Sequence, residues 1–122
     1  MIAIVIDDYD VAISHYVSDL GFTLIEDKVM SSEKRWVVVA PSKEGARILL
    51  AKAANDQQKA AIGNSTGGRV GFFMYTTNFA ETYEAYSSRG IECIEQPRQE
   101  AYGQVVVFKD KYGNKWDLIE QK

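Results

Sequence analysis

Few residues of this chain are suited to acid–base or metal chemistry. Histidine occurs once, at position 15, which argues against a metal centre built from several histidines. His15 lies in a segment with helical spacing, so we expect it to pack between that helix and a sheet. Cys93 is the single cysteine and lies in a strand-like run, which predicts a small buried apolar side chain. A functional site would therefore depend mainly on charged and aromatic groups.

Six residues are candidates for the lining of a ligand pocket: Arg69, Gly71, Phe73, Tyr75, Trp36 and Tyr102. The first four alternate along a strand-like run, residues 69–76, and alternation places them on one face. Glycine inside a strand often marks a close approach, so Gly71 would leave room for a ligand. The alternative for each aromatic residue is ordinary packing in the core.

The composition predicts an ordinary globular domain. The chain has 122 residues, of which 46% are hydrophobic and 25% charged, and its formal net charge is −3. An acidic balance does not favour nucleic acid or an anionic membrane as a partner. No apolar run approaches the roughly 18–20 residues of a membrane span, and the first residues lack the features of a signal peptide. With a single cysteine, the cytoplasm is the expected compartment.

The first half of the chain predicts a strand, a helix and three further strands. Residues 1–6 form an apolar run that is typical of a strand buried on both faces. Residues 9–20 have helical apolar spacing and are followed by Gly21, a residue that often ends helices. The three strands are expected at residues 22–30, 35–40 and 47–51. Residues 1–52 are therefore predicted to form a βαβββ module.

The same order of elements returns after a connector, residues 53–68, which ends in the flexible sequence GNSTGG. The second βαβββ module is predicted for residues 69–122. We expect its strands at residues 69–76, 91–95, 104–109 and 115–120, its helix at residues 79–89, and a solvated loop at residues 97–100. The fold class is therefore α+β, with two curved mixed sheets that enclose a cavity.

Two segments carry a resemblance to a known family. Residues 7–22 (DDYDVAISHYVSDLGF) contain an acidic turn, a helix with Tyr16 and a Leu-Gly-Phe ending, and residues 105–121 (VVVFKDKYGNKWDLIEQ) contain a strand, a turn and a strand. Both resemble the vicinal oxygen chelate superfamily, which includes glyoxalases, dioxygenases and bleomycin resistance proteins. The resemblance covers the chain and implies one domain, residues 1–122, of two modules that commonly pairs as a homodimer.

The resemblance also indicates where a metal would bind. Metal-using relatives carry His or Glu at four strand positions, which correspond here to Met1, Leu49, Asp117 and, depending on the register, Val70 or Gly71. Only Asp117 keeps a ligand type, and a single carboxylate holds a metal poorly. We therefore expect no metal cofactor, with an atypical divalent-metal site as the alternative.

Under this alignment Arg69 and Asp117 would project into one cavity. One interpretation is an ion pair that fills the former metal site, because an unpaired buried charge is costly. The other is that Arg69 presents its guanidinium to an anionic ligand while Asp117 orients it.

Three functions follow as hypotheses. The first is a protein that binds a small organic molecule without metal, with Met1 and Leu49 also lining its pocket. The second is a metal-dependent lyase, isomerase or dioxygenase of the same superfamily. The third is a homodimeric assembly domain with a vestigial pocket.

Overall fold

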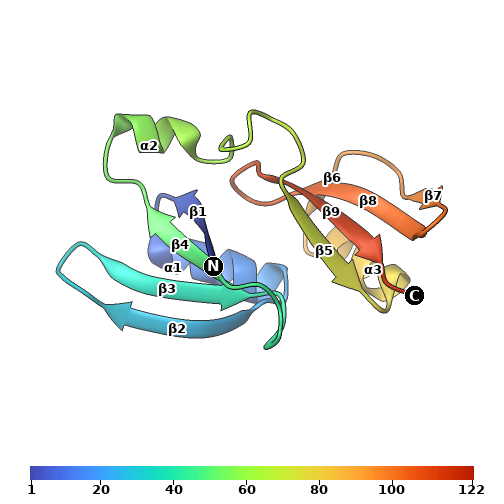
Figure 1. Ribbon diagram of the computed structural model, residues 1–122, viewed down its shortest axis with the longest axis horizontal. Coiled ribbons are helices and arrows are strands. Elements are labelled where there is room, and N and C mark those ends of the chain that lie inside the picture. The colour runs from blue at the N-terminus through green and yellow to red at the C-terminus, as the bar shows by residue number, and fades with distance from the viewer. The chain divides into compact units, whose positions relative to one another are not determined.

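The computed structural model describes all residues, Met1–Lys122, and they separate into two units, Met1–Ile62 and Gly63–Lys122. Each unit contains a mixed β-sheet, of four strands in the first unit and five in the second. The predicted α+β class with two curved mixed sheets is confirmed (Figure 1). No helix is long and apolar enough to cross a membrane.

The sheet of the first unit has the strand order β1-β4-β3-β2, with β1 parallel to β4 and the other neighbours antiparallel. Its strands are β1 (Ile2–Ile6), β2 (Thr23–Val29), β3 (Arg35–Ala40) and β4 (Ile48–Lys52). Helix α1 (Tyr9–Ile13) continues into a π-helical segment, η1 (Ser14–Asp19), between β1 and β2, and α2 (Asp56–Ala61) follows β4.

The predicted first helix contains an irregularity that its apolar spacing does not reveal. Asp8 caps α1 by accepting a hydrogen bond from the backbone N–H of Val11 at 3.0 Å. Further along, the N–H of Leu20 donates to the carbonyl of His15 at 3.1 Å, five residues back, which defines a π turn. Gly21, with a φ of 77°, then ends the helix as expected.

One face of this sheet packs under the helical segment, and alternation leaves the other face open. On the packed face Ile4 and Ile6 of β1 are buried, as is Tyr16 of η1. On the open face Ala3 is exposed. The expectation that residues 1–6 are buried on both faces is therefore wrong, because Met1, Ile2 and Ala3 are exposed at the start of an edge strand.

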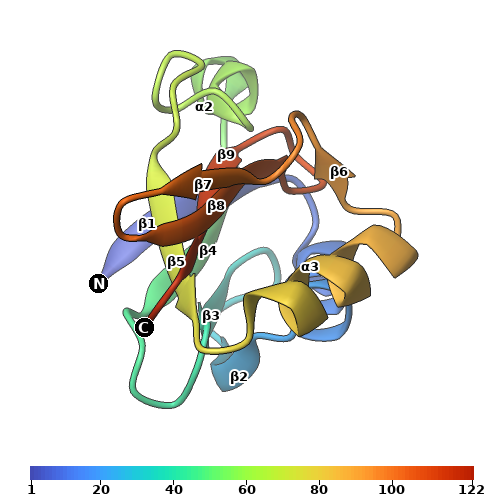
Figure 2. The same ribbon diagram turned by 90° about the vertical axis from the view of Figure 1, so that its right-hand side faces the viewer.

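The sheet of the second unit has the order β5-β9-β8-β6, and β7 also pairs with β8. Its strands are β5 (Phe72–Thr76), β6 (Glu92–Cys93), β7 (Arg98–Glu100), β8 (Gly103–Lys109) and β9 (Lys115–Glu120). Helix α3 (Phe79–Ser88) lies against one face of the sheet, as Figure 2 shows, and the hydroxyl of Tyr86 donates to the sulfur of Met74 at 3.8 Å. On the same face Trp116 stacks between Phe72 and Phe108.

Two local predictions in this unit need correction. Residues 97–100 were expected as a loop, but β7 pairs antiparallel with β8, with Arg98 opposite Val105 and Glu100 opposite Gly103. The charged side chains suit an edge strand, where water can solvate them. Cys93 is only partly buried, because β6 has two residues and also lies at an edge of the sheet.

The turn between β8 and β9 is built around a buried carboxylate. Asp110 is 5% exposed. Its Oδ1 accepts from the backbone N–H groups of Tyr112 and Asn114, both at 3.0 Å. Its Oδ2 accepts from the side-chain amide of Asn114 at 2.9 Å and from the indole N–H of Trp116 at 3.1 Å. The Asp-x-x-Gly-Asn segment of the sequence therefore has a structural role in this hairpin.

Candidate functional site

The open face of the second sheet carries exposed aromatic side chains. Alternation along β5 directs Phe72 and Met74 toward the core, so Phe73 and Tyr75 lie on the other face and are 54% and 62% exposed. Asp117 of β9 is paired with Phe73 across the parallel ladder. Sheet pairing thus brings an acidic group next to two aromatic rings.

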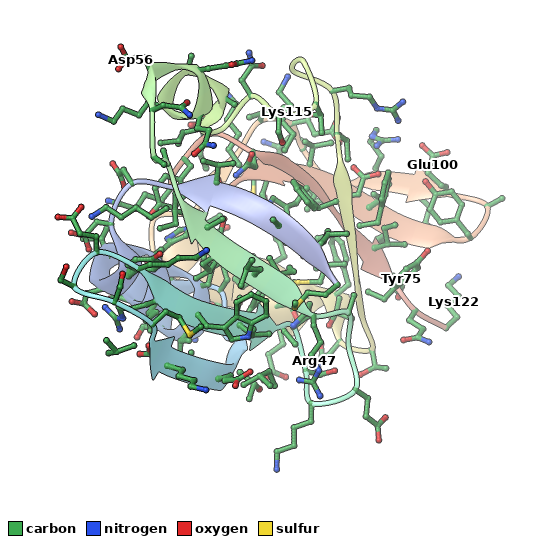
Figure 3. All side chains as sticks on the ribbon, turned by 60° about the vertical axis from the view of Figure 1, so that its left-hand side comes forward. Arg47, Asp56, Tyr75, Glu100, Lys115 and Lys122 are labelled. Atoms are coloured by element: carbon green, nitrogen blue, oxygen red, sulfur yellow. The ribbon has the colours of Figure 1, made fainter.

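These residues line a pocket of about 600 Å³ within the second unit. Its lining consists of Phe73, Tyr75, Tyr102, Asp117, Ile119, Glu120, Gln121 and Lys122. Tyr102 lies in the turn before β8 and is 54% exposed. Tyr75 and Lys122, two of these lining residues, lie near each other in Figure 3. The pocket thus brings together four of the residues predicted from the sequence: Phe73, Tyr75, Tyr102 and Asp117.

The electrostatic surroundings of Asp117 differ from those expected. Burial raises the pKa of the Asp117 carboxyl above its usual value, Arg98 counteracts this rise, and Glu95 adds to it. Arg98 donates from Nε to Glu95 at 3.0 Å and from Nη1 to Glu100 at 2.7 Å. The arginine whose charge acts on Asp117 is therefore Arg98, and two glutamates already bind its guanidinium.

The expected ion pair between Arg69 and Asp117 is not formed. Strand β5 begins at Phe72, and Arg69 is an exposed residue before it whose Nε donates to the carbonyl of Val70 at 3.0 Å. Gly71 also precedes the strand, and a Cβ atom there would overlap the methyl group of Thr66. The close approach that this glycine permits is therefore to Thr66.

Sequence reasoning missed Arg98 because residues 97–100 were interpreted as a loop. A signal was present: Arg98 and Glu100 are two residues apart and precede a short turn that ends at Gly103, whose φ is 131°. A hairpin at this point would have placed Arg98 on the sheet. Its proximity to Asp117, however, arises from the pairing of three strands that are separate in sequence.

Two further predicted residues lie in a second pocket of about 600 Å³ within the first unit. Trp36 of β3 and Leu49 of β4 both line it. The indole N–H of Trp36 donates to Glu26 at 3.1 Å, which fixes the ring on the open face of the sheet. Met1 precedes β1, is 68% exposed and lies outside both pockets.

The two sheets have matching registers, which decides the alternative between Val70 and Gly71. Ile2 pairs with Ile48 in the first unit and Phe72 with Trp116 in the second, so Met1 corresponds to Gly71. The helix caps agree, because Asp8 and Asn78 lie at the same distance after those strands. The first helical segment, which ends at Gly21, has one more residue than the second helix, and the π turn of η1 accommodates it. Because of this extra residue, an ungapped alignment of the two halves places Met1 opposite Val70.

The four positions predicted from the resemblance to correspond to the metal ligands of relatives are thus Met1, Leu49, Gly71 and Asp117. Met1 has a thioether, Leu49 an alkyl chain and Gly71 no side chain, so Asp117 supplies the single carboxylate of this set. A divalent ion with His and Glu ligands requires more nitrogen and oxygen donors than this set provides. No group of three or more His, Cys, Asp or Glu side chains in the structure could hold a metal ion. The donor set does not fit the metal of this fold.

Comparison with known proteins identifies the family. The sequence model of the Glyoxalase/Bleomycin resistance protein/Dioxygenase superfamily matches residues 1–118. The chain belongs to this superfamily. The resemblance predicted from residues 7–22 and 105–121 is therefore confirmed.

Three known proteins are similar to this chain over nearly its whole length. An uncharacterized protein of Shewanella frigidimarina (strain NCIMB 400) is 46% identical over 121 residues, which cover 98% of this chain and 90% of the relative. The crystal structure of UcmS2 has a TM-score of 0.82 and 26% identity, covering 97% and 93% of the two chains. TnmS3, an antibiotic binding protein from Streptomyces sp. CB03234, has a TM-score of 0.76 and 21% identity, covering 98% and 92%.

Proposed function

We propose that this superfamily member binds a small organic molecule with an aromatic ring, without a metal, in the pocket of the second unit. The observation that carries the proposal is the group of three aromatic side chains, each more than half exposed, around Asp117: Phe73, Tyr75 and Tyr102. Exposed aromatic rings that gather on one pocket are typical of a binding surface.

A flat ligand would gain free energy by covering these rings. Covering one ring face removes on the order of 50–80 Å² of apolar surface, which is worth roughly 1–2 kcal/mol. Two rings therefore contribute about 2–4 kcal/mol, well short of the about 8 kcal/mol that micromolar binding requires, so polar contacts must add to them. Asp117 supplies that contact, because its partly desolvated carboxylate accepts a strong hydrogen bond from a donor on the ligand.

The charges around the pocket favour a ligand with a hydrogen-bond donor or a positive charge. Asp117 and Glu120 are acidic members of the lining, and Lys122 is the basic one. Arg98 is paired with Glu95 and Glu100, so two carboxylates already balance its charge. Arg69, the residue first considered for an anion, lies outside the lining.

TnmS3 supports the proposal as a precedent for the fold. It is described as an antibiotic binding protein, and its chain superposes on nearly all of this one. The fold can thus serve binding in a protein of this size. The residues that would bind the ligand here are argued from this chain alone.

The test is a thermal-shift screen of planar aromatic compounds, with and without amino groups, in buffer that contains EDTA. A ligand at a hundredfold excess over its Kd should stabilise the protein by about 2.7 kcal/mol. Hits should be confirmed by titration calorimetry on the wild type and on Tyr75→Ala. The matched control is Tyr83→Ala, since Tyr83 stacks on Phe79 of α3 away from the pocket.

We expect Tyr75→Ala to weaken binding at least fivefold and Tyr83→Ala to leave it unchanged. Hits that require added nickel, zinc, manganese or iron would overturn the metal-free part of the proposal. Hits that bind both variants equally would place the site elsewhere.

A second candidate function, homodimeric assembly, has one observation in its favour. Strand β1 has a single strand partner, β4, and Met1 and Ile2 are 68% and 51% exposed. The N–H of Ile2 donates toward β4, to Arg47, so the N–H of Ala3 points to the free edge. If this edge pairs with a second copy, Ala3→Pro should convert a dimer into a monomer in sedimentation experiments. A wild-type protein that sediments as a monomer would end this hypothesis.

A further inference from the structure

A basic pocket lies in the first unit of an acidic protein. The pocket of about 600 Å³ that contains Trp36 and Leu49 is also lined by Lys34, Lys52 and Lys59. Glu33 is the acidic residue of the lining, although the chain as a whole has a formal net charge of −3. The charge of this pocket is therefore opposite to that of the protein.

The three lysines differ from the nearby arginine in having no acidic partner. Arg35 also lines the pocket, but it donates to Asp27 at 2.7 Å and to Asp10 at 2.8 Å, and it lies 5.3 Å from the ring centre of Tyr9. Its charge is thus neutralised within the protein. Lys34, Lys52 and Lys59 form no salt bridge, so their ammonium groups remain available to an anion.

These lysines come from three separate segments, each held by its own hydrogen bonds. Lys34 lies in the β2–β3 turn, where its carbonyl accepts from the N–H of Met30 at 2.8 Å. Lys52 is the last residue of β4. Lys59 lies on α2, whose first turn is capped by Asn55, which accepts from the N–H of Gln58 at 2.9 Å. The grouping is therefore produced by the fold and is not a local run of charge in the sequence. Asp56, labelled on the same helix in Figure 3, is exposed and is not part of the lining.

The rest of the pocket offers apolar surface beside these charges. Trp36 is partly exposed, and its N–H is bound to Glu26, so the face of its ring is the part left for contact. Leu49 is partly exposed on the neighbouring strand. Lysine is a compact cation that pairs with carboxylate or sulfonate oxygens, whereas the indole ring suits an aromatic body.

We propose that this pocket, defined by Lys34, Lys52, Lys59 and Trp36, is a second binding site that takes an aromatic anion. The aromatic body packs on Trp36, and a carboxylate or sulfonate lies among the lysines. This site shares no residue with the Asp117 pocket and requires a ligand of opposite charge. It therefore does not depend on the function proposed for that pocket.

The test compares two fluorescent probes with the same rings. 8-Anilinonaphthalene-1-sulfonate carries an anionic group, and N-phenyl-1-naphthylamine is its counterpart without the sulfonate. Both are titrated into the wild type, into the triple variant Lys34→Gln/Lys52→Gln/Lys59→Gln, and into Lys43→Gln as a control. Lys43 is an exposed lysine of the same unit in the β3–β4 turn. Native folding of each variant is verified by circular dichroism.

Each exposed ion pair should change the sulfonate affinity roughly two- to fivefold, so the triple variant should bind it at least about eightfold more weakly. Lys43→Gln should bind both probes as the wild type does. The affinity for the uncharged probe should stay within twofold in all variants.

Two results with these variants would overturn the proposal. The sulfonate could bind the triple variant within twofold of the wild type, or both probes could weaken in parallel. Tyr75→Ala separates the two sites, because it should leave sulfonate binding intact. Loss of sulfonate binding in Tyr75→Ala alone would assign the probe to the Asp117 pocket and so contradict the site proposed here.

Discussion

Replacing Asp110 with alanine should strongly destabilise the second unit. The carboxylate is 5% exposed and accepts four hydrogen bonds from three residues of one hairpin, Tyr112, Asn114 and Trp116. Removal of the carboxylate takes the acceptor away from two buried side-chain donors and from two backbone N–H groups of the turn. The turn would then lose the interactions that hold it closed.

The magnitude follows from the type of each bond. Hydrogen bonds to a charged group contribute about 1.5–3 kcal/mol each, but bonds that share one acceptor are not additive. Counting mainly the two side-chain donors gives an expected loss of about 3–5 kcal/mol in the free energy of unfolding. A loss of this size is a large fraction of the stability of a small domain, which is about 5–15 kcal/mol.

Asp110→Asn distinguishes the two halves of the network. An amide oxygen in place of Oδ1 still accepts from the backbone N–H groups of Tyr112 and Asn114. The amide NH₂ in place of Oδ2 would face two donors, the indole of Trp116 and the side chain of Asn114. We expect Asp110→Asn to lower the free energy of unfolding by about 2–3 kcal/mol, which is less than the loss expected for the alanine variant.

The assay is urea denaturation in a Trp36→Phe background, so that fluorescence arises from Trp116, which is 2% exposed in the second unit. Asp7→Ala is the matched control, because Asp7 is exposed, and it should change stability by less than about 0.5 kcal/mol. A loss below about 1.5 kcal/mol for Asp110→Ala would refute the role assigned to this carboxylate. Equal losses for Asp110→Ala and Asp110→Asn would show that the bonds from the backbone N–H groups of Tyr112 and Asn114 contribute nothing.

Three further outcomes are expected. Gly63 and Gly67 have similar φ values of 74° and 70°, but a Cβ at Gly63 would overlap the carbonyl of Tyr112, whereas one at Gly67 meets nothing within 4 Å. Gly67→Ala should therefore cost about 1 kcal/mol and Gly63→Ala at least about 2 kcal/mol more, and equal losses in urea titrations would contradict this. Burial raises the pKa of Asp117 in the folded state above its value in the unfolded chain. Through this group, the folded protein is therefore less stable at a pH above these values, where Asp117 is charged, than at low pH, where it is protonated in both states. Asp117→Asn should thus stabilise the protein at pH 7 but not at pH 3, and a gain that persists at pH 3 would argue against this. Burial also raises the pKa of the Cys93 thiol, so alkylation by iodoacetamide should have a higher pH midpoint in the native protein than in urea.

Regular strands could be predicted closely from the sequence. Residues 35–40 and 115–120 were expected as strands, and β3 and β9 have these bounds. In β3 the β-branched residues Val37, Val38 and Val39 are all buried, and in β9 Trp116 and Leu118, two residues apart, are buried on one face. Alternation also predicted that Phe73 and Tyr75 share a face.

Irregular features could not be predicted in the same way. A π turn adds one residue to a helix without changing the apolar face at either end, so the spacing of residues 9–20 did not reveal η1. Strand β7 is short and charged, and its strand conformation depends on pairing with β8. The position of Arg98 beside Asp117 depends on that pairing, so local sequence favoured Arg69 instead.

The matching registers of the two sheets limit the chemistry of Asp117. Leu49 and Asp117 occupy equivalent positions, opposite Ala3 and Phe73, and the position equivalent to Met1 is Gly71. Since a Cβ at Gly71 would overlap Thr66, a longer side chain there could not be accommodated without moving Thr66. The residue just before β5 that would complete a metal site with Asp117 is thus a glycine with no room for a ligating side chain. A desolvated carboxylate beside exposed aromatic rings can still accept a hydrogen bond from an aromatic ligand, and this is the chemistry on which the proposed function rests.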